Sequence, residues 1–341
     1  MKVVILNTKP DTRFHFGKAL GAFTEESHNT QKMTSNYLHS DTLWSAMVNA
    51  WALSCPESVE GFIDYCNSGK FKISSAFYCY IPKLHEEQKK LNEAVFFLPK
   101  PASLNLFKYS EPKNLKKVMF ISKGVWESGL LPNDWFDSEK CILLQNNSIV
   151  ALKSEIEKSF NLFSTETAAK TSARDITKRE DTFYFQTDLY LSNNVQWYFF
   201  IENKLPDNLQ ADYQKAMHTL VNLGIGGERT TGCGSIVGYE ELDFDFKFAG
   251  NSTVEEKVSL SLILPDKDEL TKRALYQIIK RGGRFIEKGK SLPMVQMLLE
   301  GAVLDKEVKG RIVELYDQPK VMRYGLSFLI PFHCNFQTTN F

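Results

Sequence analysis

The features that this 341-residue sequence lacks exclude several classes of protein. No apolar run approaches the roughly 18 residues of a membrane span. The first residues, MKVVILNTKP, have neither the apolar core nor the small-residue cleavage site of a signal peptide. Basic and acidic residues number 41 each, so there is no overall basic field to attract duplex nucleic acid. We therefore expect a cytoplasmic protein with no membrane partner.

Motifs for metals and redox chemistry are also missing. None of the six cysteines forms a C-x-x-C pair, and no group of cysteines and histidines has zinc-finger spacing. The sequence thus predicts no metal site and reduced, mostly buried thiols.

Glycine, by contrast, is concentrated in one stretch, LGIGGERTTGCGSI, at residues 223–236. A Walker A loop requires a lysine where Cys233 stands. A dinucleotide-binding loop follows a strand and opens a helix, whereas this stretch follows a predicted helix and opens a predicted strand. We therefore expect no ATP or NAD cofactor.

A different chemistry suits this glycine loop. Its backbone N–H groups and polar side chains can donate to the phosphates of a nucleic-acid backbone. The simpler alternative is a long turn between a helix and a strand. Arg229 is the strongest candidate as a phosphate clamp, and the alternative for it is an ion pair that braces the loop. The predicted RNA-binding residues of the loop are Gly224, Gly226, Gly227, Arg229, Thr230, Thr231, Gly232 and Gly234.

Hydrophobic periodicity predicts an α+β fold with two units. Residues 1–241 contain, in order, a strand (2–8), a helix (39–54), a strand (71–82), two strands paired as a hairpin through a turn at 192–194 (183–191 and 195–202), a helix (205–223) and a strand (235–242). This β-α-β-β-α-β order is ferredoxin-like. Residues 83–182 form an insertion, within which the polar segment 164–182 is an exposed loop or a protruding hairpin.

A second, degenerate ferredoxin-like unit is predicted for residues 242–341. Its elements are a strand at 256–265, a helix at 268–283 and strands at 294–304 and 324–332. The basic stretch 270–291 carries seven basic residues and one glutamate, which indicates a contact with RNA or with a partner protein; a solvated face is the alternative.

The string GIGGERTTGCGSI resembles the glycine-rich loop of the RAMP superfamily of CRISPR proteins. Three further segments match the Cas5-type subunit of the type III-A effector in order: LHSDTLWSAMVNAW, ISSAFYCYIP and RGGRFIEKGKSLPMVQMLLEGAVL. The resemblance spans nearly the whole chain. It implies two ferredoxin-like (RRM-like) domains and no cofactor.

The resemblance also implies a non-catalytic scaffold. Such a subunit holds the repeat-derived 5′ handle of crRNA and meets target RNA only indirectly. It bridges the large Cas10-type polymerase–nuclease subunit and the first Csm backbone subunit. The alternative is a metal-independent endoribonuclease of the same fold, with His15 or His39 as the base and Arg229 stabilising the phosphorane. No motif supports a metabolic enzyme.

Other polar residues are weaker candidates for RNA contact. In TRFHFGK, alternation places Arg13 and His15 on one side of an extended segment and two phenylalanines on the other, with Lys18 following. The start of the first helix suits an anion, although Ser40 or Asp41 could simply cap it. The remaining candidates are His39 and Ser40 at that helix start, Lys170, Ser172 and Arg174 in the hairpin, and Arg281 and Arg284 in the basic stretch.

Overall fold

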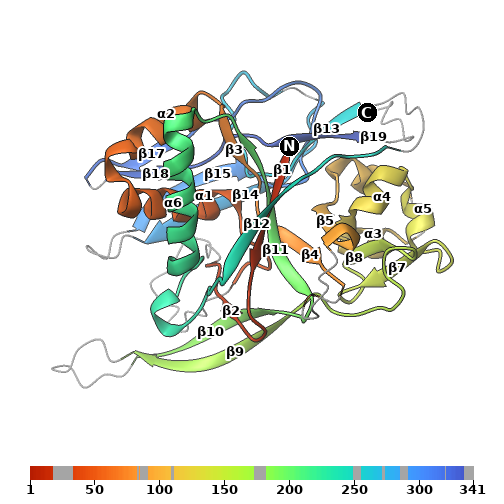
Figure 1. Cartoon of the computed structure of the whole chain (residues 1–341). Helices are drawn as coiled ribbons and strands as arrows, with labels where there is room; N and C mark the ends of the chain where they lie inside the picture. Colours follow the sequence, from red (N-terminus) through yellow and green to blue (C-terminus); the bar gives the residue numbers. More distant parts are fainter. Residues whose placement is uncertain are drawn as a thin grey trace.

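The computed structural model describes residues 1–17, 34–82, 84, 91–108, 111–172, 182–248, 255–270, 273–284, 291–318 and 320–333. These residues form a mixed α+β fold around one nine-stranded sheet. Helices α1, α2 and α6 lie at one end of the molecule, and a smaller group of helices and strands lies at the other (Figure 1).

The first unit has the element order expected of a ferredoxin-like fold. Its strands stand in the order β12-β1-β11-β4, with β3 also paired to β11. The elements are β1 (Lys2–Asn7), α1 (Ser40–Ser54), β3 (Phe71–Ile73), β4 (Phe77–Tyr80), β11 (Val195–Asn203), α6 (Asp207–Leu223) and β12 (Gly238–Asp243). Both helices were predicted, and the expected apolar stripe of α6 is buried: Leu209, Tyr213, Ala216, Met217 and Leu220.

The strand predicted at 71–82 is divided into two. The break falls at Ser74 and Ser75, where the Ser75 N–H donates to the Leu260 carbonyl at 2.8 Å instead of continuing the ladder with β11. A backbone donor that leaves its sheet must find another partner when buried. The carboxy-terminal part of the chain supplies that partner here.

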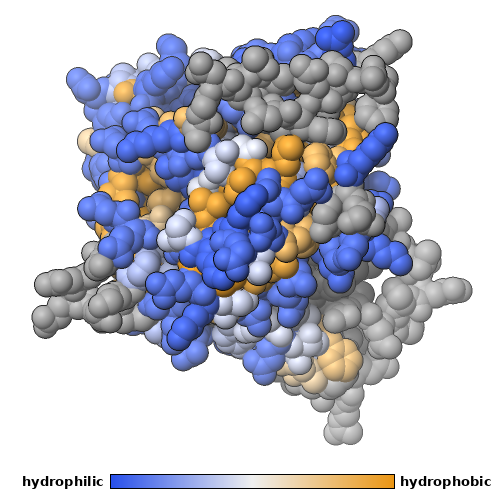
Figure 2. Space-filling view, turned by 90° about the vertical axis from the view of Figure 1, so that its right-hand side faces the viewer, coloured by the Kyte–Doolittle hydropathy of each residue, from blue (hydrophilic) through white to orange (hydrophobic). Residues whose placement is uncertain are grey.

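The insertion after β4 extends the same sheet. It continues the strand order as β4-β5-β6-β8-β7, and only the β6–β8 pair in that run is parallel. Its elements are β5 (Val95–Pro99), α3 (Pro112–Lys117), β6 (Phe120–Ser122), α4 (Lys123–Ser128), α5 (Pro132–Trp135), β7 (Cys141–Leu144) and β8 (Ile149–Leu152). The short helix α2 (Val59–Asn67) precedes the insertion and packs beside α1. Single 3-10 turns occupy Pro56–Ser58, Leu91–Glu93, Ala102–Leu106 and Arg229–Thr231. Figure 2 shows an apolar band across the face at this end.

The predicted protruding hairpin is present and longer than expected. Strands β9 (Phe163–Ser172) and β10 (Thr182–Leu191) pair over their full length, and the two-residue strand β2 (Arg13–Phe14) pairs with the base of β10. The expected pairing of 183–191 with 195–202 was wrong. The turn at 192–194 does form, since the Val195 N–H donates to the Ser192 carbonyl. It joins two different sheets, however, because β11 lies between β1 and β4.

The helix predicted at 268–283 was also wrong. Residues 278–284 form strand β14 (Ile278–Arg284), paired with β15 (Ser291–Leu298). Ile278 and Lys280 are exposed while Ile279 and Arg281 face inward, which is the period of two of a strand. Two adjacent isoleucines and two glycines in this stretch also disfavour a helix.

The second unit is therefore not ferredoxin-like in the part that the structure describes. Between residues 255 and 333 the described segments carry strands and no helix: β13 (Glu255–Ser259), β14, β15, β16 (Val303–Leu304), β17 (Val313–Tyr316), β18 (Val321–Arg323) and β19 (Leu329–His333). They form small sheets of two or three strands. The main apolar core runs across the predicted boundary at 241/242, for example through the stacked rings of Trp44 and Tyr324.

Within the described ranges, no helix is long and apolar enough to cross a lipid bilayer.

Candidate nucleic-acid interface

The glycine loop after α6 adopts a backbone that most residues cannot. Gly224, Gly226, Gly232 and Gly234 all have positive φ. A Cβ on Gly234 would lie 1.9 Å from the Ile225 carbonyl oxygen, so the two ends of the loop meet too closely for any side chain. Close backbone approach therefore explains Gly224, Gly226 and Gly234, and positive φ alone explains Gly232.

Most of the loop's N–H groups hold the loop in place. Gly227 donates to the His15 carbonyl at 2.8 Å and Gly234 donates to the Arg13 carbonyl at 2.6 Å, which fixes the loop to the segment around β2. The carbonyl of Glu228, at a positive φ of 56°, accepts from the N–H groups of Thr231 and Cys233. These N–H groups are therefore used within the protein.

The loop tip is exposed and carries the predicted phosphate clamp. Arg229, Thr230, Thr231 and Gly232 are all exposed. Arg229 forms no ion pair or side-chain hydrogen bond with any residue in the described segments. The alternative in which Arg229 braces the loop thus has no support there. Bracing comes instead from the carbonyl of Glu228.

The predicted alternation around β2 is confirmed. Phe14 and Phe16 are buried and pack edge-on against Trp197 of β11, with centroid distances of 5.7 and 5.4 Å. Arg13 and His15 point to the other side, toward Asp188 of β10. The aromatic side anchors the segment to the main sheet and leaves the basic side against the hairpin.

Arg13 joins the glycine loop to the hairpin. Its Nη2 donates to the Thr231 carbonyl at 2.7 Å, and its Nη1 lies 3.9 Å from Oδ2 of Asp188. The side chain keeps a relative exposure of 33%, whereas that of Asp188 is 6%. His15 is buried, and its Nδ1 donates to the Thr187 carbonyl at 3.0 Å. Arg13 is thus available to a ligand, and His15 holds the hairpin in place.

The hairpin brings one more candidate to this junction. Lys170 of β9 is half-buried, and its charge lies close enough to Cys233 of the glycine loop to favour the thiolate, although burial dominates and raises the pKa of that thiol. Ser172 is the last residue of β9, and Arg284 is the last residue of β14. Lys18 and Arg174 lie outside the described residues.

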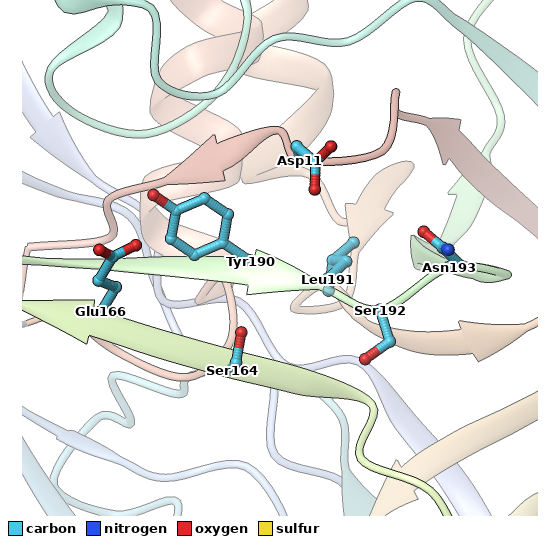
Figure 3. A pocket seen from close by; sticks show the side chains of 7 residues that line it. All are labelled: Asp11, Ser164, Glu166, Tyr190, Leu191, Ser192 and Asn193. Atoms are coloured by element: carbon cyan, nitrogen blue, oxygen red, sulfur yellow. The ribbon is translucent and has the colours of Figure 1, made fainter.

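A polar depression of about 560 Å³ lies at the base of the hairpin (Figure 3). Tyr190 forms one wall, with Glu166 beside it. Asp11 lies across from them, on the segment that precedes β2. Burial raises the pKa of the Tyr190 hydroxyl, and the charge of Glu166 raises it further. Two carboxylates make this depression unfavourable for an anion, whereas the side with Arg13 and the loop tip is favourable. The lining residues are Asp11, Ser164, Glu166, Tyr190, Leu191, Ser192 and Asn193.

Three other predicted RNA-binding residues bind partners within the protein instead: Arg281, His39 and Ser40. Arg281 is buried and forms a two-pronged pair with Asp41, at 2.9 Å for both Nε–Oδ2 and Nη2–Oδ1. Arg323 binds the same carboxylate. Burial alone would raise the pKa of Asp41, but the two guanidinium groups hold it far below its usual range. The prediction that Ser40 or Asp41 caps α1 was wrong, since the cap position is His39 and no side chain caps the helix there.

His39 and Ser40 belong to a neighbouring buried network. His39 Nδ1 lies 2.9 Å from Oε1 of Glu300, which also accepts a hydrogen bond from Ser75. These partners outweigh the effect of burial and lower the pKa of Glu300. The Ser40 hydroxyl accepts from the Leu262 N–H at 3.0 Å. Both networks join α1 to the carboxy-terminal part, and we leave their members out of the proposed interface.

Sequence reasoning missed Asp188, Glu300 and the role of Asp41. All three are acidic residues with at most 7% exposure, each held by a basic residue distant in sequence. The only local signal is an acid in an otherwise apolar element, such as Asp188 in FYFQTDLYL.

One cluster of potential ligand residues is compact enough to hold a metal ion. The potential ligand atoms of Cys55, Glu57 and Asp212 lie within 4.8 Å of one another. Asp212 already accepts hydrogen bonds from Ser58 at 2.8 Å and Lys215 at 3.2 Å. These bonds account for the group, and we assign no metal to it.

Comparisons with known proteins agree on one family. Residues 252–332 match the model of the CRISPR Csm4 C-terminal domain. The chain is 25% identical to the CRISPR system protein Csm4 of Methanocaldococcus jannaschii, over 98% of both chains. It shares its fold with a chain of the Csm3–Csm4 subcomplex of the type III-A CRISPR–Cas interference complex (TM-score 0.68, 23% identity, 98% and 100% coverage). It also matches a chain of a Csm1–Csm4 cassette in complex with cA4 (TM-score 0.56, 17% identity, 98% and 99% coverage). The carboxy-terminal part of the chain thus matches the Csm4 C-terminal domain, and the whole chain is similar to Csm4 proteins in sequence and fold.

Proposed function

We propose that the chain is a non-catalytic RNA-binding subunit of a cytoplasmic type III-A Csm complex. It holds the 5′ repeat handle of crRNA between the glycine loop and the β9–β10 hairpin. It also bridges a large Csm1-type subunit and a Csm3-type backbone subunit, and it meets target RNA only through them. No cofactor takes part.

The convergence of three segments carries the RNA-binding part of the proposal. The loop, β2 and the hairpin come from residues 223–236, 13–14 and 163–191, and they meet at Arg13. Figure 1 shows the loop below α6, facing the hairpin. The meeting point presents Arg229, the exposed hydroxyl of Thr230 and a partly exposed Arg13, which are groups that bind phosphates. The Thr231 hydroxyl donates to the Glu228 carbonyl at 2.9 Å and so helps to hold the loop.

The bridging part rests on the relatives. Their solved complexes pair Csm4 with Csm3 in one case and with Csm1 in the other. The apolar band in Figure 2 supports it, since exposed apolar surface of this kind is typical of subunit contacts.

The ribonuclease alternative gains no support from the geometry. Both histidines that could act as the base are buried and engaged, His15 with Thr187 and Asp188, and His39 with Glu300. A general base must reach the 2′-hydroxyl of its substrate. We therefore keep the scaffold as the proposed function.

A binding experiment tests the proposal. The chain is assembled with Csm1-type and Csm3-type subunits and mixed with 5′-labelled crRNA, with or without its handle. Native gels measure affinity and denaturing gels detect cleavage. We expect Arg229→Ala to weaken handle binding about tenfold, the loss of one phosphate contact.

The matched control is Arg311→Ala. Arg311 is an exposed arginine in a surface pair with Asp266, far along the chain from the loop. It should bind like the wild type. Equal binding with and without the handle would refute the proposed site. Cleavage in the absence of metal would favour the ribonuclease, and failure of the two other subunits to associate through this chain would refute the bridge.

A further inference from the structure

We propose that Asp188 is a positioning residue of the RNA site, which acts by orienting Arg13. This inference rests on the proposed function and goes beyond it, because a buried acid beside a phosphate-binding surface would ordinarily weaken RNA binding. The sign of its effect can therefore be tested.

Asp188 lies at the centre of the contacts that hold the hairpin to β2. The residue is only 4% exposed. Oδ1 accepts a hydrogen bond from Gln186 at 2.7 Å and lies 3.5 Å from Nδ1 of His15, while Oδ2 faces Nη1 of Arg13. The hydrogen bond from Gln186 fixes the carboxylate, so its charge can in turn orient the guanidinium.

Arg13 is held from two sides and remains partly exposed. The Thr231 carbonyl of the glycine loop accepts a hydrogen bond from one end of the guanidinium, and the Asp188 carboxylate of the hairpin lies 3.9 Å from the other end, where its charge attracts the guanidinium. A guanidinium has five N–H donors in one plane, so two anchors leave others for a phosphate. Without the carboxylate, the side chain keeps its charge but loses its fixed plane, and two-pronged phosphate binding depends on that plane.

The hairpin provides a matched control on the same face. Glu166 is the direct cross-strand partner of Asp188, and directly paired residues of an antiparallel ladder point to the same side. Glu166 is exposed, and it contacts Tyr190. Its replacement by glutamine removes the same charge at nearly the same place without touching the anchor of Arg13.

The two variants are expected to differ in sign. Removing a negative charge close to bound phosphates favours binding, so Glu166→Gln should bind handle-bearing crRNA as tightly as the wild type or more tightly. Asp188→Asn should bind about tenfold more weakly, the size of a moderate coupling between contacting residues. Affinities are measured with the assembled complex, and thermal unfolding verifies that each variant is folded.

A double-mutant cycle tests whether Asp188 acts through Arg13. In an Arg13→Gln background, Asp188→Asn should cause no further loss of affinity. If Asp188→Asn does not fold, Arg13→Lys replaces it: this variant keeps the charge and leaves Asp188 in place, and it should still weaken binding because an ammonium cannot form the two-sided contact.

The possible failures are distinguishable. Wild-type complex that does not recognise the handle would overturn the proposed function and this inference with it. Wild-type recognition combined with equal or tighter binding by folded Asp188→Asn would overturn the inference alone. So would an Arg13→Lys variant that binds like the wild type, or additive losses in the cycle.

Discussion

The glycine loop permits a prediction that can be worked out atom by atom. Gly234 has a φ of +77°, and a Cβ there would lie 1.9 Å from the Ile225 carbonyl oxygen and 2.9 Å from its carbonyl carbon. These are backbone atoms, so no side-chain rotation relieves the clash. Gly227, seven residues earlier in the same loop, has no positive φ, and its Cβ would meet the His15 ring at 3.4 Å, an ordinary contact.

The two positions should therefore respond very differently to alanine. A left-handed conformation costs a side chain about 1–2 kcal/mol, and forced overpacking costs about 1–3 kcal/mol. Gly234→Ala should lower the free energy of unfolding by about 2–5 kcal/mol. Gly227→Ala should change it by less than about 1 kcal/mol, with a small gain from the reduced freedom of the unfolded chain.

Urea unfolding followed by tryptophan fluorescence measures both variants. Since Trp197 packs against the two phenylalanines that flank the loop contacts, it reports on this region. RNA binding provides a second readout, because the altered loop would no longer seat against Arg13. A Gly234→Ala variant as stable as Gly227→Ala would refute the reasoning that close approach explains the glycines.

Two further predictions concern buried charges. Asp41→Asn leaves the guanidinium groups of Arg281 and Arg323 buried without their anion, and we expect a loss of about 3–5 kcal/mol in the free energy of unfolding at pH 7. Because the pKa of Asp41 is depressed in the folded protein, the wild type should lose this advantage only as the pH falls below about 4, which urea unfolding at several pH values would show. For Lys100, burial lowers the pKa to about 8. Between pH 8 and 9.5 this lysine binds more protons in the unfolded chain, so by itself it raises stability by about 1.5 kcal/mol over that range. Buried thiols such as Cys66 and Cys141, whose pKa values burial raises, act in the opposite direction, so the measured quantity is the difference between the wild type and Lys100→Met. The wild type should gain about 1.5 kcal/mol relative to the variant over this range, and parallel profiles would contradict this.

The elements that the sequence predicted correctly are those whose packing is decided locally. Helix α6 has one solvent-facing side, so its buried stripe follows from a period of 3.6 residues. Strand β1 is an uninterrupted apolar run, and it pairs with β11 on one side and with β12 on the other. The alternation of Arg13 to Phe16 likewise follows from the period of two in an extended chain.

The incorrect predictions depended on partners distant in sequence. The turn at 192–194 is a real turn, but nothing local indicates that β10 and β11 separate into different sheets. In the segment 278–284, two isoleucines and two glycines only disfavour a helix, and pairing with β15 decides that it is a strand. In the same way, Arg281 is one of many basic residues in its stretch, and its partner Asp41 lies 240 positions away.

The glycine loop combines both situations. Its unusual composition identified it as a special loop, yet the expected reason, a row of N–H donors for phosphate, describes only part of its chemistry. Several of those N–H groups bind the loop to itself and to β2, and the glycines are required because these backbones touch. What faces outward is the Arg229–Thr231 tip and one edge of Arg13. In this protein the closely packed glycines build the support, and we infer that the binding groups are the arginines and the Thr230 hydroxyl held on it. Substitution of a closely packed glycine such as Gly234 should therefore affect stability and RNA binding together, whereas substitution of Arg229 should affect RNA binding alone.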